Sequence, residues 1–337
     1  MDIDIILEPD VTPDELKELG LLAERNGINR LWIQNYSAAR DGFMSLVPLA
    51  IASTRIKIGV MVVSPWEMHP LKMANALLTL NEYSKGRATL CVGGGAEWNG
   101  VMCIPVERRV RAVRETTELL KAACGDHVVT NYQGEMYKAG HFTAKWATDE
   151  PPLIYTGAGQ EQMIRMSTKK ADGIVLSDAV PAFTNDAMGF VRETLPERDA
   201  SVGPFRVSNF WAWHVKADRE VALKESRREL IIRSWLSKHH IKSFMSEEDN
   251  EYIQANKNAF ITAYRDRSGN IKDIPQRIID ELIEGITTTG DLTEMDKHLA
   301  RLTEFKDAGL DELALRLHDD PADAIEMIGE HVVSAMQ

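Results

Sequence analysis

The sequence predicts an α/β fold in which eight strand–helix units close into a (β/α)8 barrel. Short apolar, β-rich runs alternate with longer amphipathic runs along the chain, a pattern typical of a parallel sheet. Most of the strand runs are almost continuously apolar, as strands buried on both faces should be. Eight such units in 337 residues favour a closed barrel over the alternative, an open doubly wound sheet.

The expected elements follow one another in strict alternation. The first helix begins at Thr12-Pro13, because threonine caps a helix and proline suits its first turn. Strands are expected at residues 3–7, 30–34, 56–63, 88–92, 153–156, 173–176, 206–215 and 312–317. Helices are expected at residues 13–26, 43–53, 70–83, 106–123, 160–170, 182–194, 294–308 and 321–333.

Two segments interrupt this alternation within what is expected to be a single domain, residues 1–337. Residues 128–144 contain glycine-centred turns and indicate a small hairpin. Residues 225–273 lie between the seventh and eighth strands and are polar and helical. Inserts on this side of a barrel cover the mouth of the active site, so a lid or substrate wall is expected. A dimer or packing contact is the alternative.

Charge and cysteine content exclude several classes of protein. The formal net charge of −12 argues against a nucleic-acid-binding surface and against an anionic membrane as a partner. The three cysteines lack paired spacing, so neither a disulfide framework nor a zinc site is expected. No apolar stretch is long enough to span a bilayer, and the first residues lack the basic region of a signal peptide. A cytoplasmic enzyme is the resulting expectation.

The strand at 88–92 leads directly into three glycines, Gly93, Gly94 and Gly95. Without Cβ atoms, this backbone lets a flat ring or a phosphate lie against it. A tight turn is the alternative for the motif taken alone. In a barrel, however, the carboxyl ends of the strands are where ligands bind, which favours a ligand wall here.

A second strand end of the same kind follows residues 153–156. It carries Thr156, Gly157, Ala158, Gly159 and Gln160 just before a helix. Small residues before a helix N-terminus expose N–H groups toward an anion, so a phosphate is expected there, with a plain turn as the alternative. Two such ends on one rim indicate a long cofactor with a ring at one side and a phosphate at the other.

The other strand ends carry few groups suited to different chemistry. No three His, Cys, Asp or Glu residues recur at metal-ligand spacing, so no metal site is expected. A Gly-x-Ser-x-Gly elbow and a Walker loop are also missing from the sequence. These patterns leave cofactor chemistry as the main prediction.

The motifs, in this order, resemble the bacterial-luciferase-like superfamily of flavin and deazaflavin oxidoreductases. Within it the chain resembles the coenzyme F420-dependent group, which includes methylenetetrahydromethanopterin reductase and F420-dependent glucose-6-phosphate dehydrogenase. The stretches that carry the resemblance are 52–59, Ser64-Pro65, His69-Pro70, 84–87, 92–95, 152–159, 171–173 and 308–312. They span nearly the whole chain.

The resemblance implies a luciferase-like (β/α)8 TIM barrel, a homodimer and a defined cofactor site. A non-prolyl cis peptide at the end of the third strand, here Met61–Val62, would lie behind the central ring of the cofactor. The phosphate would be held by backbone N–H groups of 156–160. The implied cofactor-binding residues are Met61, Val62, Ser64, Gly93, Gly94, Gly95, Thr156, Gly157, Ala158, Gly159, Gln160, Leu176 and Ser177.

Two departures from the F420-dependent pattern bear on the chemistry. Where that group usually has Asp-His after the second strand, this chain has Asn35 and Tyr36. The acidic residue often found after the glycines is Ala96 here, with Glu97 one position later. Tyr36 or Glu97 is therefore expected to donate the proton, with Glu8 as a further candidate and Asn35 as a hydrogen-bonding member of the site.

Three functions follow from these features. The first is an F420-dependent oxidoreductase that transfers a hydride between the deazaflavin and a small organic substrate, because the ring supplies the chemistry and the protein positions it. The second is an FMN-dependent monooxygenase of the luciferase type, supplied with reduced flavin by a partner reductase. The third is a barrel that binds a flavin without catalysis.

Overall fold

The computed structural model describes residues 1–95 and 97–337, so the prediction made at Ala96 lies outside the described residues. Eight parallel strands form a closed barrel, because β9 pairs with both β8 and β11. They are β1 (Asp2–Leu7), β2 (Arg30–Gln34), β3 (Lys57–Val63), β4 (Ala88–Val92), β7 (Leu153–Gly157), β8 (Gly173–Ser177), β9 (Arg206–Val215) and β11 (Glu312–Arg316). The predicted fold class is confirmed, and the strand boundaries agree to within one residue.

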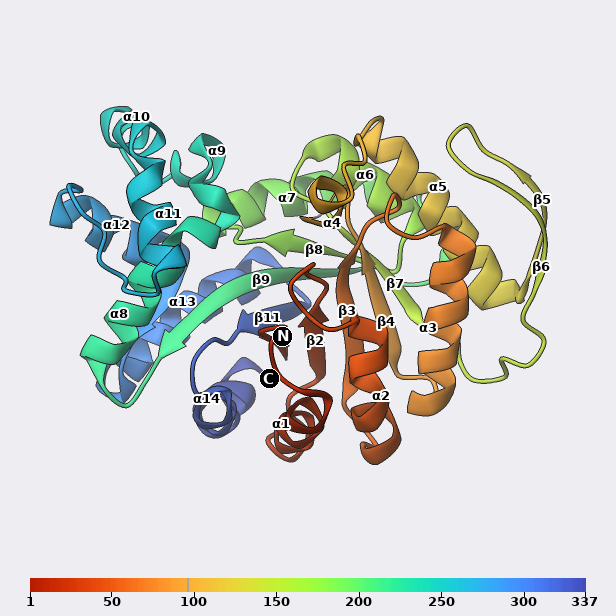
Figure 1. Ribbon diagram of the computed structural model, residues 1–337, viewed down its shortest axis with the longest axis horizontal. Coiled ribbons are helices and arrows are strands. Elements are labelled where there is room, and N and C mark those ends of the chain that lie inside the picture. The colour runs from red at the N-terminus through yellow and green to blue at the C-terminus, as the bar shows by residue number, and fades with distance from the viewer. Residues whose placement is uncertain (96) are drawn as a thin grey trace.

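Helices surround the barrel as an outer layer (Figure 1). They are α1 (Pro13–Arg25), α2 (Gly42–Ala52), α3 (Pro70–Ser84), α5 (Arg109–Lys121), α6 (Glu161–Lys170), α7 (Pro181–Thr194), α13 (Met295–Ala308) and α14 (Pro321–Ile328). Helix α1 begins as predicted, since Thr12 and Glu15 form a capping box and Pro13 occupies the first turn.

Residues 128–144 contain an antiparallel hairpin, β5 (Val128–Gln133) and β6 (Lys138–Thr143), which lies outside the barrel beside α5 (Figure 1). The carboxylate of Glu115 on α5 fastens its tip by accepting the backbone N–H groups of Glu135, Met136 and Tyr137. The hairpin is therefore anchored to the wall of the barrel that carries the glycine-rich end of β4.

The long connection after β9 is mainly helical. It contains α8 (Arg219–Glu229), α9 (Lys238–Ile241), α10 (Glu247–Ala255), α11 (Lys257–Arg265) and α12 (Gln276–Ile286), and Figure 1 shows them gathered at the far end of β9. A strand that the sequence did not predict, β10 (Thr287–Gly290), then pairs with residues 212–215 of β9. Three consecutive threonines explain both its strand conformation and why it was missed, because so short a run has no alternation to read.

Several shorter elements complete the chain. They are α4 (Glu97–Val101), α15 (Ser334–Met336), π turns at Ala122–Asp126 and Gly329–Val333, and 3-10 turns at Leu195–Glu197, Ala200–Val202, Leu230–Ile232, Ser234–Leu236 and Leu292–Glu294. Within residues 1–95 and 97–337, no helix is both long and apolar enough to cross a membrane.

The interior of the barrel is filled by one small cluster of side chains. Its members are Ile6, Trp32, Met61, Cys91, Tyr155, Val175 and Ala314, one from each of seven strands. Arg30 closes the amino end of this cluster, held between the carboxylates of Asp4 and Glu312 at 2.7 and 2.8 Å. Because the amino end is packed shut, a ligand can reach the barrel axis only from the carboxyl ends of the strands.

Candidate functional site

A cavity of about 280 Å³ opens at the carboxyl ends of the barrel strands. Most of the residues that the resemblance implied as cofactor-binding line it together. These are Met61, Val62, Gly93, Gly94, Gly95, Gly157, Ala158, Gly159, Leu176 and Ser177. Gln34, Tyr36, Val175 and Phe210 complete the wall. Residues of β2, β3, β7, β8 and β9 and the glycines after β4, which are far apart in the sequence, therefore meet around one slot, as the barrel predicts.

One side of this slot is formed where β3 meets β4. The peptide bond between Met61 and Val62 is cis, as the resemblance implied, and the pairing of β3 with β4 shifts in register at this point. Gly93 lies directly against the bulge, since a Cβ on it would come within 2.9 Å of the Val62 Cβ. Glycine is therefore required here by the close approach of two chains.

The other wall, at the end of β7, is more open. A Cβ built on Gly157 would make only ordinary contacts, the nearest 3.6 Å from Val62, and one built on Gly159 would meet nothing within 4 Å. Gln160 precedes α6 and its side chain makes no capping hydrogen bond to the helix. The backbone N–H groups at the start of α6 are thus not taken by a side-chain cap, and the anion site expected there stays a prediction.

Three of the predicted cofactor-binding side chains lie outside the slot. Thr156 is buried, and its hydroxyl donates to Ser167 of α6 at 2.6 Å, because successive strand residues face opposite sides of the barrel wall. Ser64 is buried and accepts the backbone N–H of Trp66 at 3.2 Å. At Thr156 and Ser64, therefore, only backbone groups are left to meet a ligand. Gln160, just before α6, is exposed and does not line the slot.

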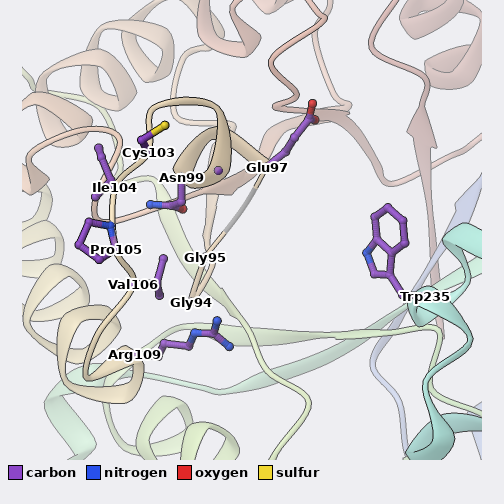
Figure 2. Close-up of a pocket in the computed structure, with 11 residues that line it drawn as sticks. Gly94, Gly95, Glu97, Asn99, Cys103, Ile104, Pro105, Val106, Arg109 and Trp235 are labelled. Carbon is purple, nitrogen blue, oxygen red and sulfur yellow. The ribbon is translucent and has the colours of Figure 1, made fainter.

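A larger cavity of about 690 Å³ adjoins the slot and shares Gly94 and Gly95 with it. Its floor is the segment between β4 and α5, with Arg109 at the start of that helix. Figure 2 shows Trp235, from the insert after β9, on the far side of this cavity from Arg109. The insert predicted to form a lid or wall does contribute a wall residue. The slot and the larger cavity together offer room for a flat ring and an extended tail.

Tyr36 is the predicted proton donor that lines the slot itself. Burial raises the pKa of its hydroxyl, and the nearby guanidinium of Arg316 opposes this effect. The hydroxyl therefore keeps its proton near neutral pH and can act as a donor. Glu97, the second candidate, lines the larger cavity instead and accepts a hydrogen bond from the hydroxyl of Ser37.

Asn35 and Glu8 are held in contacts beside the slot. The amide of Asn35 donates to the backbone oxygen of Val62 at 3.3 Å and to Glu67 at 2.6 Å. Glu8 accepts from Arg316 at 2.8 Å and lies 3.0 Å from His318. Burial would raise the pKa of Glu8, but Arg316 and His318 outweigh burial and hold this pKa well below its usual range. Glu8 is thus an ionised partner of Arg316, which suits positioning better than proton donation.

Glu67 is a site residue that sequence reasoning missed. Burial raises the pKa of its carboxyl to about 7, while hydrogen bonds from the Ser64 backbone and Asn35 oppose that rise. Its Oε2 is buried and has no partner among the described residues. The only sequence signal was an acid close behind the third strand, in a loop whose path the sequence does not reveal.

The chain is similar in sequence to one protein family and to several named oxidoreductases. The family model of the luciferase-like monooxygenases matches residues 3–312. The 5,10-methylenetetrahydromethanopterin reductase of Archaeoglobus fulgidus is 24% identical over 338 residues, covering 98% of this chain and 98% of the relative. The F420-dependent glucose-6-phosphate dehydrogenase of Kineococcus radiotolerans is 26% identical over 176 residues, covering 48% of this chain and 52% of that relative.

A solved structure extends the likeness to the whole fold. The coenzyme F420 dependent tetrahydromethanopterin reductase from Methanopyrus kandleri superposes with a TM-score of 0.83, covering 100% of this chain and 99% of that chain at 20% identity. The family model runs from β1 to the first residue of β11. The resemblance drawn from the motifs is confirmed, and the chain belongs to the luciferase-like monooxygenase family.

Proposed function

We propose that this protein is an F420-dependent oxidoreductase that transfers a hydride between the deazaflavin and a small organic substrate. The observation that carries the proposal is the slot at the barrel mouth, walled by the β3 bulge on one side and by the glycines of β4 and β7 around it. Relatives named as a reductase and a dehydrogenase, the latter explicitly F420-dependent, favour the same chemistry.

The residues present fit a flat heteroaromatic ring. Met61 and Val62 offer an apolar surface, and the glycine backbone leaves N–H and C=O groups within reach of ring-edge atoms. Gln34 is almost fully buried in the slot, and its Oε1 has no partner among the described residues, so it is free to accept an N–H from a ring. When bound there, a deazaflavin supplies the hydride-carrying carbon, and the protein supplies orientation.

The phosphate and tail are assigned to the two neighbouring features. The uncapped start of α6, after Gly157, Ala158 and Gly159, offers backbone N–H groups to the phosphate. The larger cavity, with Arg109 on its floor, accommodates the anionic tail beyond it. Tyr36 holds a proton at the slot wall and is the donor we assign to the substrate.

We further propose that the chain acts as one barrel domain and as a homodimer in the cytoplasm, as the family resemblance implies. Size-exclusion chromatography with light scattering measures the assembly. A mass of one chain would overturn the dimer without touching the cofactor assignment, because all of the slot residues come from a single chain.

Titration of the purified protein with F420 and with FMN tests the function. We expect F420 to bind at least roughly tenfold more tightly than FMN, followed by its absorbance and fluorescence. Preference for FMN, with oxygen consumed when reduced FMN is supplied, would instead establish the monooxygenase. Tight binding with no hydride transfer to any acceptor tested would indicate the non-catalytic barrel, and binding of neither cofactor would overturn all three.

A further inference from the structure

Arg233, which follows α8 in the insert, is completely buried yet poorly satisfied. Its Nη1 donates to Asp178 at 3.3 Å, and its side chain has 0% exposure. Its Nε and Nη2 have no hydrogen-bond partner among the residues that the structure describes. A guanidinium stays protonated inside proteins, so these are N–H donors of a buried charge. Leaving such N–H donors unpaired costs free energy, which points to a hydrogen-bond partner that arrives from outside the chain.

The position of Arg233 is directly behind the wall of the slot. Its Cζ lies 5.6 Å from the centre of the Phe210 ring, and Phe210 lines the slot. The next residue, Ser234, donates its backbone N–H to Asp178 at 2.9 Å and its hydroxyl to the Ser177 carbonyl at 3.0 Å. Arg233 is therefore held at the end of β8 by Asp178, the residue that follows Ser177 of the slot wall.

The charges around Arg233 leave it with an unmet demand for a negative partner. Arg316 lies over the same Phe210 ring at 5.6 Å, but it has Glu8 at 2.8 Å. Burial lowers the pKa of Arg233 and Arg316 lowers it further, and the carboxylates of Asp178, Glu229 and Glu8 oppose this shift without restoring the usual value. Both guanidinium groups therefore have one nearby carboxylate, but the contact of Arg233 with Asp178, at 3.3 Å, is the longer of the two and leaves its Nε and Nη2 without a partner among the described residues.

We propose that Arg233 binds a carboxylate of the substrate on its Nε–Nη2 edge, so that the enzyme acts on small organic acids. This edge presents two parallel N–H groups, the arrangement that matches the two oxygens of a carboxylate. The body of the acid lies against Phe210 and Leu176 in the slot. The inference rests on the proposed function in one respect, that the substrate occupies the slot beside the ring.

Access to Arg233 runs through the turn that follows it. Ser234, Trp235 and Leu236 all hold left-handed backbone conformations, with φ of 45°, 53° and 44°. Three consecutive non-glycine residues in this region are strained. In the proposed complex a shift of this turn uncovers the guanidinium for the incoming carboxylate. Trp235 is 67% exposed at the larger cavity, whereas Leu236 is fully buried in the core, so the shift is confined to Ser234 and Trp235.

Benzoate and benzamide test the proposal, because they share a shape and differ in charge. Calorimetric titration of the protein, with and without bound F420, is expected to show benzoate binding at least roughly tenfold more tightly than benzamide. Arg233→Gln is expected to bring the two affinities within about twofold of each other. Arg219→Gln, which alters an exposed arginine of α8 paired with Glu294, is the matched control and should keep the preference.

The outcomes separate this inference from the cofactor assignment. Equal affinities in the wild type, no benzoate binding, or a preference kept in Arg233→Gln would each overturn it, whether or not F420 binds. In the F420-loaded protein, inorganic phosphate that binds more tightly than benzoate and loses this affinity in Arg233→Gln would overturn the carboxylate assignment. If Arg233→Gln fails to fold, Arg233→Lys keeps the charge but lacks the planar edge. It should weaken benzoate about threefold to tenfold and leave benzamide unchanged.

Discussion

Two fully buried arginines at opposite ends of the same barrel differ sharply in how they are satisfied. Arg30, at the amino end, bonds Asp4 and Glu312 and lies 5.1 Å from the Trp32 and Tyr155 ring centres. Arg233, at the carboxyl end, has one carboxylate at 3.3 Å and two unpartnered nitrogens. Burial lowers the pKa of both groups, but Asp4 and Glu312 more than restore that of Arg30.

The difference shows at which end of the barrel the buried polar groups have partners within the protein. At the amino end the charges neutralise one another and close the barrel. At the carboxyl end Arg233, Gln34 and Glu67 each keep a buried atom without a partner. Unpartnered buried atoms also occur elsewhere, Arg30 Nε among them, but Gln34 lines the slot, Glu67 bonds Asn35 beside it and Arg233 lies behind Phe210, so a ligand in the slot is placed to complete these three.

The first prediction compares the loss of stability when each of the two arginines is replaced by methionine. Arg30→Met should lower the free energy of unfolding by about 3–5 kcal/mol, because two buried carboxylates lose their shared partner. Arg233→Met should cost less, about 2–3 kcal/mol, because it leaves one buried carboxylate, Asp178, without its cation, and Asp178 still accepts the Ser234 N–H. Urea unfolding measures both. Equal losses would show that the two ends do not differ as described.

A second prediction fills the slot from its open side. Gly157→Val should weaken cofactor binding by at least about 100-fold, because its side chain would stand where the ring lies. The fold should tolerate it, since the nearest protein atom to a Cβ there is 3.6 Å away. Fluorescence titration gives the affinity and thermal unfolding checks the fold. Gly189→Ala, on α7 in open space, is the matched control and should bind normally.

Much of this arrangement was predictable from the sequence, because strand ends in a barrel meet by topology. The glycines of β4 and β7 are far apart in the chain, yet strict β/α alternation places both on one rim. The position of a residue along a strand also determines whether its side chain faces the barrel interior or the surrounding helices. Thr156 points to α6 while Tyr155 enters the barrel interior, and strand alternation would have separated them.

The residues that escaped prediction lie on segments whose path no local pattern defines. Glu67 lies in the loop after β3 and Arg233 follows the 3-10 turn after α8, and the significance of both depends on which polar partners they contact or lack. Glu8 illustrates the converse, since a carboxylate at a strand end looked like a proton donor. Its role changed once Arg316 and His318, about 300 residues later in the chain, were found beside it.

The third prediction uses the unusual carboxyl of Glu67. Burial raises its pKa from 4.5 to about 7, so its stabilising contribution is complete below about 4.5 and is lost as the pH rises through about 7. Glu67→Gln stays neutral, and above pH 7 it should be more stable than the wild type by about 1–2 kcal/mol, allowing for partial solvent screening. Urea unfolding across this pH range measures the difference.

The matched control for that prediction is Glu82→Gln, on the exposed face of α3. It should follow the wild-type stability at every pH tested. A constant offset between Glu67→Gln and the wild type from pH 4.5 to 8 would mean that the carboxyl does not titrate in this range. In that case the unpartnered oxygen would mark a gap in the packing rather than a strained charge.

The smallest expected effect concerns Arg109, an exposed cation on the floor of the larger cavity. Its neighbours Arg108 and Arg111 pair with Glu135, whereas Arg109 has no ion pair among the described residues and is available to an anionic tail. Arg109→Gln should therefore leave unfolding unchanged and weaken F420 about twofold to fivefold at low salt, with the loss vanishing near 1 M salt. Titrations at both salt concentrations measure it.

FMN provides a comparison for the same titration, because FMN carries a phosphate but lacks an extended tail beyond it. Its affinity should respond less to Arg109→Gln than that of F420, and Arg219→Gln should affect neither. Equal weakening of both cofactors would place Arg109 at the phosphate and remove that role from the start of α6. The carboxyl end of the barrel would then bind its anion through a side chain, as its amino end binds its own carboxylates through Arg30.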